Sequence, residues 1–258
     1  MKKIRLNANF GAYWKFMKRI APKMRQWHRD AYRGSIFEHY ILFGPPAPDR
    51  PLLELLLSYY DEANGEFSIP DSKTGGVKRV IFDIQWVHNH TYFPVNGEVP
   101  SINRDSKNRI WVQYFAPLFK TEEGKKLKKG TKTHRSYLEG QLERLVESTE
   151  QQDIQDFVLL QILYQCSLIW CPRCGEGIPR PILRYLDSIE RVNGVAWAQL
   201  IYSEIIRSIG VALKGKKKSG MTHVPGCMTL LCVSSMFYSL SKYFCSDLCH
   251  VSSNVWSC

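Results

Sequence analysis

The sequence predicts a mainly α protein: a single helical domain with at most a small β element, preceded by a basic amphipathic N-terminal arm. Apolar residues recur at helical spacing in 10–29 and 197–209, and 157–170 is almost wholly apolar. Few segments alternate in the manner of a strand. The chain has 258 residues, of which 44 % are hydrophobic, so it can bury one core of useful size.

The N-terminal arm, residues 1–48, is predicted to contain a helix with an apolar stripe and a basic face. Pro22 is expected to kink or divide this helix. The apolar stripe consists of Phe10, Tyr13, Trp14, Met17, Ile20, Met24 and Trp27. The basic face carries six candidate contacts for a polyanion, which are Lys15, Lys18, Arg19, Lys23, Arg25 and Arg29.

Residues 49–243 are predicted to form the helical body. A Leu-rich helix begins at Pro51 and is expected to end at Asn64-Gly65, before a brief strand at 66–70. The segment 77–87 is rich in β-branched residues and is compatible with a strand or a helix. The turn-rich stretch 88–134 is expected to be a long surface excursion. Further helices are predicted near 138–146, 157–170, 182–189 and 197–209, and after Pro225-Gly226.

The net charge of +11 is concentrated in three segments. Residues 1–33 hold ten Lys or Arg and one acid, and 125–135 and 214–218 together hold ten more bases and no acid. The rest of the chain is mildly acidic. This distribution indicates local contact with a polyanion, although solvated loops have the same composition. The candidate contacts outside the arm are Lys125, Lys126, Lys128, Lys129, Lys216, Lys217 and Lys218.

Three interpretations of the arm are compatible with the sequence. Its Trp and Tyr residues, interleaved with cations, suit phosphate contact combined with base stacking. The cations could instead solubilise a helix that docks by its aromatic stripe, or contact a membrane surface or act as a transit sequence. Six phosphate contacts would make log affinity fall with log salt at a slope of about −5. The apolar run 227–240 is shorter than the ~20 residues of a membrane-spanning helix, so no span is predicted. Nucleic acid is the partner expected for the basic segments, and no membrane is counted among the expected partners.

Two short motifs are compatible with a metal site. Cys171-Pro-Arg-Cys174 has the spacing of a zinc knuckle, and its second pair of ligands would have to come from distant Cys or His residues. The alternatives to a zinc site here are a loop with two free thiols and a redox-active cysteine pair. His88 and His90 would lie on one side of an extended segment, without a third ligand nearby. Neither motif is assigned as a metal site, and no cofactor and no catalytic residue are predicted.

The order of the body's segments resembles the plant mobile domain family, often labelled aminotransferase-like. The resemblance covers roughly 52–231 and lies in LLELLLSYYDEANGEFSIP at 52–70, FVLLQILYQCSLIWCP at 157–172 and LRYLDSIERVNGVAWAQLIYSEIIRSI at 183–209. VPGCMTLL at 224–231 also matches, and 81–99 is a weaker match. After about Cys232 the sequence departs from the family pattern, and 244–258 is a Ser- and Cys-rich tail. Such an end is compatible with a truncated or mis-spliced reading frame.

This resemblance implies a non-catalytic, transposon-derived interaction module in the nucleus, or else in the cytoplasm. It implies nuclear proteins as partners, and a setting of transposon silencing or mobility. Nothing in the residues marks a Schiff-base lysine with its pyridinium partner, so the aminotransferase label implies no activity here. The alternative is a fragment of a transposon-encoded polyprotein, whose transposase or SUMO-type protease domain lies outside this chain. The sequence predicts no oligomeric state.

Overall fold

The protein is mainly α-helical, with a small three-stranded sheet and a separate short parallel strand pair, which confirms the predicted fold class. The structure is a computed structural model and describes residues 4–42, 50–71, 74–100, 108–117, 135–172, 178–215 and 222–233. Its longer helices are α1 (Phe10–Ile20), α2 (Gln26–Tyr32), α3 (Arg50–Ser58), α4 (Ile84–Thr91), α6 (Arg135–Leu145), α7 (Gln151–Gln165) and α10 (Trp197–Gly215). The shorter ones are α8 (Arg180–Leu183), α9 (Ile189–Asn193) and α11 (Thr229–Val233).

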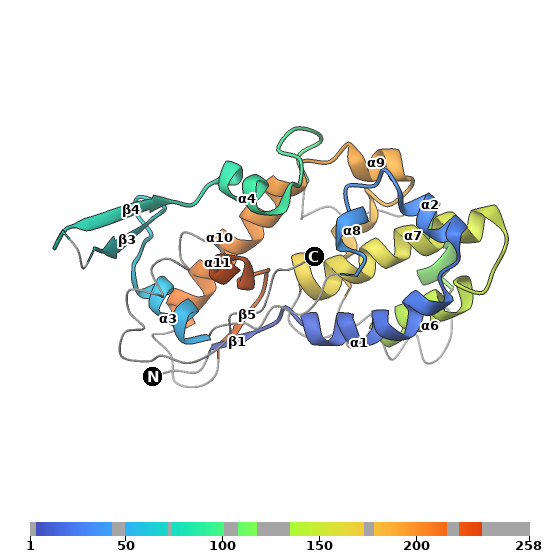
Figure 1. Ribbon diagram of the computed structural model, residues 1–258, viewed down its shortest axis with the longest axis horizontal. Coiled ribbons are helices and arrows are strands. Elements are labelled where there is room, and N and C mark those ends of the chain that lie inside the picture. The colour runs from blue at the N-terminus through green and yellow to red at the C-terminus, as the bar shows by residue number, and fades with distance from the viewer. Residues whose placement is uncertain are drawn as a thin grey trace.

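The helices gather into two neighbouring groups (Figure 1). Helices α1, α2, α6 and α7 lie at one end, where α7 contacts both α2 and α6. At the other end, α10 contacts α3 and α4. Buried apolar side chains form one continuous core from Ile4 to Cys232, so both groups share it. Most of the described part of α7 is buried, in agreement with the apolar run in its sequence.

Helices α1 and α2 are separated near Pro22, as predicted. The Asn9 side chain accepts a hydrogen bond from the Ala12 N–H and caps the start of α1. A short 3-10 turn, Ala21–Lys23, follows α1 and carries the proline in its first turn, after which α2 begins. The apolar stripe faces inward: Tyr13 and Met17 are fully buried. The Tyr13 and Phe16 rings both lie against Tyr164 of α7.

The three-stranded sheet has the order β2-β3-β4 and is antiparallel throughout. Its strands are β2 (Tyr60–Asp61), β3 (Glu66–Pro70) and β4 (Val77–Ile81). The strand predicted at 66–70 is therefore confirmed. The expected end of the Leu-rich helix was wrong, because α3 already ends at Ser58 and Asn64-Gly65 lies in the turn that joins β2 to β3. Gly65 has a φ of 68°, which glycine adopts without strain.

The ambiguous segment 77–87 contains both a strand and the start of a helix. Strand β4 ends at Ile81, and the Asp83 side chain accepts a hydrogen bond from the Trp86 N–H, which starts α4. Tyr92 closes α4 in the left-handed conformation.

Part of the stretch 88–134, expected to be a surface excursion, contributes to the core. Phe93, Ile110 and Phe115 are fully buried, and a π-helical turn spans Trp111–Phe115. Gly97 approaches residues 194–196 so closely that a Cβ would lie 2.5 Å from the Gly194 carbonyl oxygen. The Glu98 N–H donates to that same oxygen. Segments about 100 residues apart in sequence are thereby held together at the N-terminus of α10.

The first and last described segments meet in a parallel strand pair. Strand β1 (Ile4–Leu6) runs beside β5 (Thr222–Val224), with Ile4 opposite Thr222 (Figure 1). The Asn7 N–H continues the ladder by donating to the Val224 carbonyl oxygen. The N-terminal segment is therefore anchored to the main body both by this pair and by the docked face of α1. Within the described residues, none of the helices combines the length and apolarity needed to cross a bilayer.

Candidate nucleic-acid interface

The structure brings together the six cations predicted on the arm. Lys15, Lys18 and Arg19 lie on α1, on the face opposite its buried stripe. Lys23 follows in the 3-10 turn, and Arg25 and Arg29 belong to the start and middle of α2. All six are exposed. The six cations therefore lie on the surface of one continuous segment, but only some of them form ion pairs with acidic side chains.

Two of the six cations bind acidic side chains that follow one another along α6 and its C-terminal end. Arg19 lies 2.6 Å from a Glu143 carboxylate oxygen and 3.9 Å from Glu139. The Lys23 ammonium donates to Glu147 at 2.8 Å, and this hydrogen bond lowers the pKa of the Glu147 carboxyl. All these side chains are substantially exposed, so each pair contributes modestly to stability. Their charges are already compensated, which makes Arg19 and Lys23 poor candidates for contacting phosphate.

The other four cations, Lys15, Lys18, Arg25 and Arg29, have no ion-pair partner among the described residues. Two of them lie over tryptophan rings. The Lys18 ammonium is 5.4 Å from the Trp14 ring centre, and the Arg25 guanidinium is 5.2 Å from that of Trp27. The Trp27 side chain retains 37 % exposure. This arrangement offers positive charge for phosphates and an aromatic surface for an unstacked base.

The remaining predicted contacts lie outside the described residues. These are Lys125, Lys126, Lys128, Lys129, Lys216, Lys217 and Lys218. Their part in a binding surface stays a prediction.

The candidate zinc ligands are placed only in part. The Cys171 side chain is buried at the end of a π-helical turn, Cys166–Trp170, and Cys174 lies outside the described residues. Across the described segments, no group of three His, Cys, Asp or Glu side chains could hold a metal ion. Burial raises the pKa of the Cys166 thiol, and raises that of Cys227 to about 12, so both remain protonated at neutral pH.

The expected arrangement of His88 and His90 was wrong, because both belong to helix α4 instead of an extended segment. Side chains two residues apart on a helix point in widely different directions. Each ring also has its own backbone contact: His88 Nδ1 lies 2.7 Å from the Phe93 carbonyl oxygen, and His90 Nδ1 lies 2.7 Å from that of Trp86. The two imidazoles are thus held apart.

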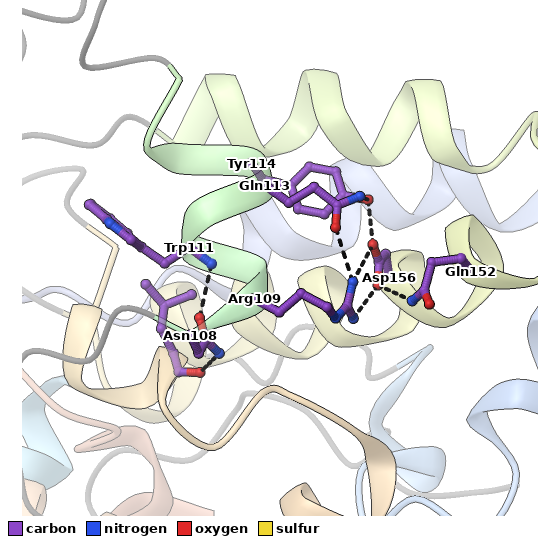
Figure 2. Close-up of polar contacts among 8 residues, drawn as sticks. Asn108, Arg109, Trp111, Gln113, Tyr114, Gln152 and Asp156 are labelled. Carbon is purple, nitrogen blue, oxygen red and sulfur yellow. Dashed lines mark hydrogen bonds and ion pairs between the residues drawn. The ribbon is translucent and has the colours of Figure 1, made fainter.

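An ion pair between a buried carboxylate and an arginine whose side chain is 38 % exposed, which sequence reasoning missed, joins residues 108–117 to α7 (Figure 2). The Asp156 carboxylate is fully buried and binds the Arg109 guanidinium through both oxygens, at 2.6 and 3.0 Å. It also accepts hydrogen bonds from the Tyr114 hydroxyl at 2.6 Å and from Gln152 at 2.9 Å. Gln113 completes the cluster by accepting from Arg109 and donating to Tyr114.

This cluster has the properties of a structural clamp. Four donor contacts occupy the two oxygens of Asp156, so no lone pair is left over for a substrate. Burial, followed by the hydrogen bond to Asp156, raises the pKa of the Tyr114 hydroxyl. The hydrogen bonds that Arg109 itself donates to Asp156 raise the pKa of the guanidinium, which remains charged. The only sequence signal for this site is a carboxylate directly before the apolar run 157–170.

No family model, curated protein or solved structure matches this chain. The resemblance to the plant mobile domain family therefore stays a prediction.

A buried histidine makes stability depend on pH. His28 of α2 is fully buried, packs edge-on against Phe157, and accepts a hydrogen bond from the Arg25 N–H through Nδ1. Burial lowers its pKa below 6.5; the Leu145 carbonyl opposes this in part, and the Arg25 charge lowers the pKa by a smaller amount. The unfolded chain thus binds the proton more readily. The stability that neutral His28 contributes is complete above about pH 6.5 and is lost as the pH falls below it.

We expect His28→Asn to reduce the loss of stability between pH 7.5 and pH 5, because asparagine can accept the Arg25 hydrogen bond and does not titrate. Urea denaturation at a series of pH values measures this. His39→Asn, a matched change at an exposed histidine, should leave the pH dependence as in the original chain. Equal pH dependence in the His28 and His39 variants would show that His28 is not responsible.

Proposed function

We propose that the chain is a non-catalytic interaction module that binds nucleic acid through the exposed face of α1 and α2. The observation that carries this proposal is the set of four cations, Lys15, Lys18, Arg25 and Arg29, that form no ion pair in the described residues. Of these, Arg25 acts on an acidic side chain at longer range, since its charge contributes to the lowered pKa of Glu147. Their neighbours Arg19 and Lys23 are compensated by α6. The binding surface is therefore smaller than the six cations of the basic face suggest.

The chemistry of this face favours nucleic acid over other polyanions. Phosphate contact needs only exposed Lys and Arg, but Trp14 and Trp27 add aromatic rings beside two of the cations. Aromatic stacking suits bases that are not already stacked within a duplex. We therefore infer a preference for single strands over duplexes of the same length. The oxygens of the buried Asp156 carboxylate are saturated by hydrogen bonds from within the protein, which supports a structural role for this cluster.

A matched pair of variants tests the proposal. Lys18→Gln with Arg25→Gln removes one lysine and one arginine from the uncompensated set, whereas Lys23→Gln with Arg19→Gln removes one of each from the compensated set. Because each phosphate contact contributes about 0.7–0.9 to the slope of log affinity against log salt, we expect the first variant to bind a labelled single strand about 30-fold more weakly at 0.1 M salt. The second should change affinity by less than about threefold.

Fluorescence anisotropy with a labelled single-stranded 20-mer provides the measurement, and circular dichroism confirms that both variants fold. Equal losses of affinity in the two variants would contradict the assignment, because net charge alone would then account for binding. Absence of binding by the original chain would contradict the proposed function itself.

The cellular setting is part of the same proposal. We propose that the protein acts in the nucleus, in a transposon-derived context, with nuclear proteins as partners; the resemblance of 52–231 to plant mobile domains supports this. Affinity purification from plant nuclei, with and without nuclease, tests it. Partners that are lost on nuclease treatment would be joined to the protein through nucleic acid, and retained partners would bind the protein directly. Recovery of the protein only from the cytoplasm would contradict the nuclear setting.

A further inference from the structure

Strand β4 presents an exposed, partly apolar edge at the end of the molecule away from α1 and α2 (Figure 1). Val77 and Ile81 keep 63 % and 66 % of their surface exposed. Arg79 lies between them, with its side chain 74 % exposed. Because side chains alternate along a strand, these three share one face of the sheet, and Val80 points to the other face and is buried.

The backbone groups of these same three residues point to the open edge. The Ser68 N–H donates to the Tyr59 carbonyl oxygen at 2.8 Å, so the Ser68 backbone bonds toward β2 and not toward β4. Its partner across the β3–β4 ladder is Arg79. Hydrogen-bonded and non-hydrogen-bonded pairs alternate in antiparallel sheets. Val77, Arg79 and Ile81 therefore direct their N–H and C=O groups away from β3.

Nothing in the described part of the sheet covers this edge. The sheet order places β4 last, and its register with β3 runs without interruption from Glu66–Ile81 to Pro70–Val77. Strand β4 contains neither a bulge nor a proline, two of the devices that commonly protect an edge strand. Among the devices that protect an edge strand from pairing with other chains, β4 has two adjacent cations, Lys78 and Arg79.

These cations determine what the edge can accept. Antiparallel pairing of all five β4 residues with a second copy would set Arg79 opposite Arg79, and like charges in that position are destabilising. The Glu66 carboxylate lies 3.5 Å from the Arg79 guanidinium and compensates part of its charge, but the Arg79 side chain remains 74 % exposed and can contact a second acidic group. An acidic side chain opposite Arg79 would complement this charge. Apolar side chains two residues to either side would cover Val77 and Ile81.

We propose that β4 is a docking edge for an extended segment of a partner protein with the pattern apolar-x-acidic-x-apolar. The segment adds a fourth strand to the sheet, and its backbone bonds to Val77, Arg79 and Ile81. Affinity comes from these backbone bonds and the two apolar contacts, and selectivity comes from Arg79. The surface lies outside the proposed nucleic-acid interface, so the two proposals can fail independently.

Two labelled peptides and four variants of the full chain test this inference. One peptide contains Val-Thr-Glu-Thr-Val and the other Val-Thr-Lys-Thr-Val, with the same flanking residues. We expect the original chain to bind the Glu peptide about tenfold more tightly than the Lys peptide. Arg79→Glu should invert that preference, and Arg79→Gln should abolish it. Lys78→Glu makes the same charge change as Arg79→Glu on the opposite face of the strand, and should preserve the preference.

A backbone control separates strand addition from simple charge attraction. N-methylation of alternate residues on the edge of the Glu peptide that faces β4 should abolish binding, and methylation of the other edge should not. Circular dichroism of each variant confirms folding. Three results would overturn the inference: no binding of the Glu peptide at 1 mM, loss of preference in the Lys78 variant as large as in the Arg79 variants, or a concentration-dependent dimer that Ile81→Lys dissociates. The last would assign the edge to a second copy of the chain.

Discussion

Replacing Arg109 by methionine is expected to destabilise the fold by about 3–5 kcal/mol, because it leaves a fully buried carboxylate without its cation. Tyr114 and Gln152 would still donate to Asp156, but two neutral hydrogen bonds do not replace a bidentate guanidinium. The stem of methionine fills much of the volume of the arginine stem, so loss of packing contributes little. The free energy of unfolding in urea measures the effect.

Two further variants show whether the buried charge is the cause. Arg33→Met makes the same replacement at an exposed arginine paired with Asp30, and should cost less than about 1 kcal/mol. Adding Asp156→Asn to Arg109→Met should recover much of the loss, since removing both charges of a buried pair is often nearly neutral. If the double variant were as unstable as the single one, the account of Asp156 as a charge that requires compensation would be wrong.

Replacing Tyr13 by alanine is expected to cost about 3–5 kcal/mol, although this residue belongs to the basic arm. Its ring is fully buried against Tyr164, and its hydroxyl donates to the Ile41 carbonyl oxygen at 2.9 Å. The same hydroxyl accepts hydrogen bonds from Gln161 and Gln165 of α7. The substitution therefore opens a cavity and removes one of the hydrogen-bond partners of each of two buried amides, and the second effect adds to the first.

The neighbouring Trp14 provides a matched control. It is only half-buried, so Trp14→Ala should cost distinctly less than Tyr13→Ala in the same urea experiment. Similar losses for both would mean that the arm is not docked through its buried stripe. Truncation of residues 1–33 would remove Tyr13 together with the cations, and we expect it to unfold the α7 end of the protein. Surface substitutions are therefore the proper test of binding.

The sequence predicted the helices well wherever their burial is periodic. The stripe from Phe10 to Met24, its interruption at Pro22 and the long helix from Trp197 all follow from local spacing and backbone chemistry, whereas Trp27, predicted in the stripe, is 37 % exposed. Boundaries that depend on pairing partners were not predictable in this way. Helix α3 ends at Ser58 because Tyr60 and Asp61 pair with β3, and β4 gives way to α4 at the Asp83 cap.

The cations of the candidate site were predictable from the sequence, but their ion pairs with distant residues were not. Sequence spacing indicated that six cations share a face, but Arg19 and Lys23 are compensated by glutamates more than 100 residues away. The Arg109–Asp156 ion pair was not predicted for the same reason, because the two residues are 47 positions apart in sequence. Hydrophobic periodicity describes which face of an element is buried. It contains no information on which charged residue of a distant element will lie opposite.

The central claim is that Lys15, Lys18, Arg25 and Arg29 form the part of the arm that contacts phosphate. The most direct test is the salt dependence of binding to a single-stranded 20-mer, for the original chain and for a variant with glutamine at all four positions. We expect the slope of log affinity against log salt to be shallower by about 3 in the variant, at 0.7 per contact for single strands. An unchanged slope in a folded variant would contradict the claim.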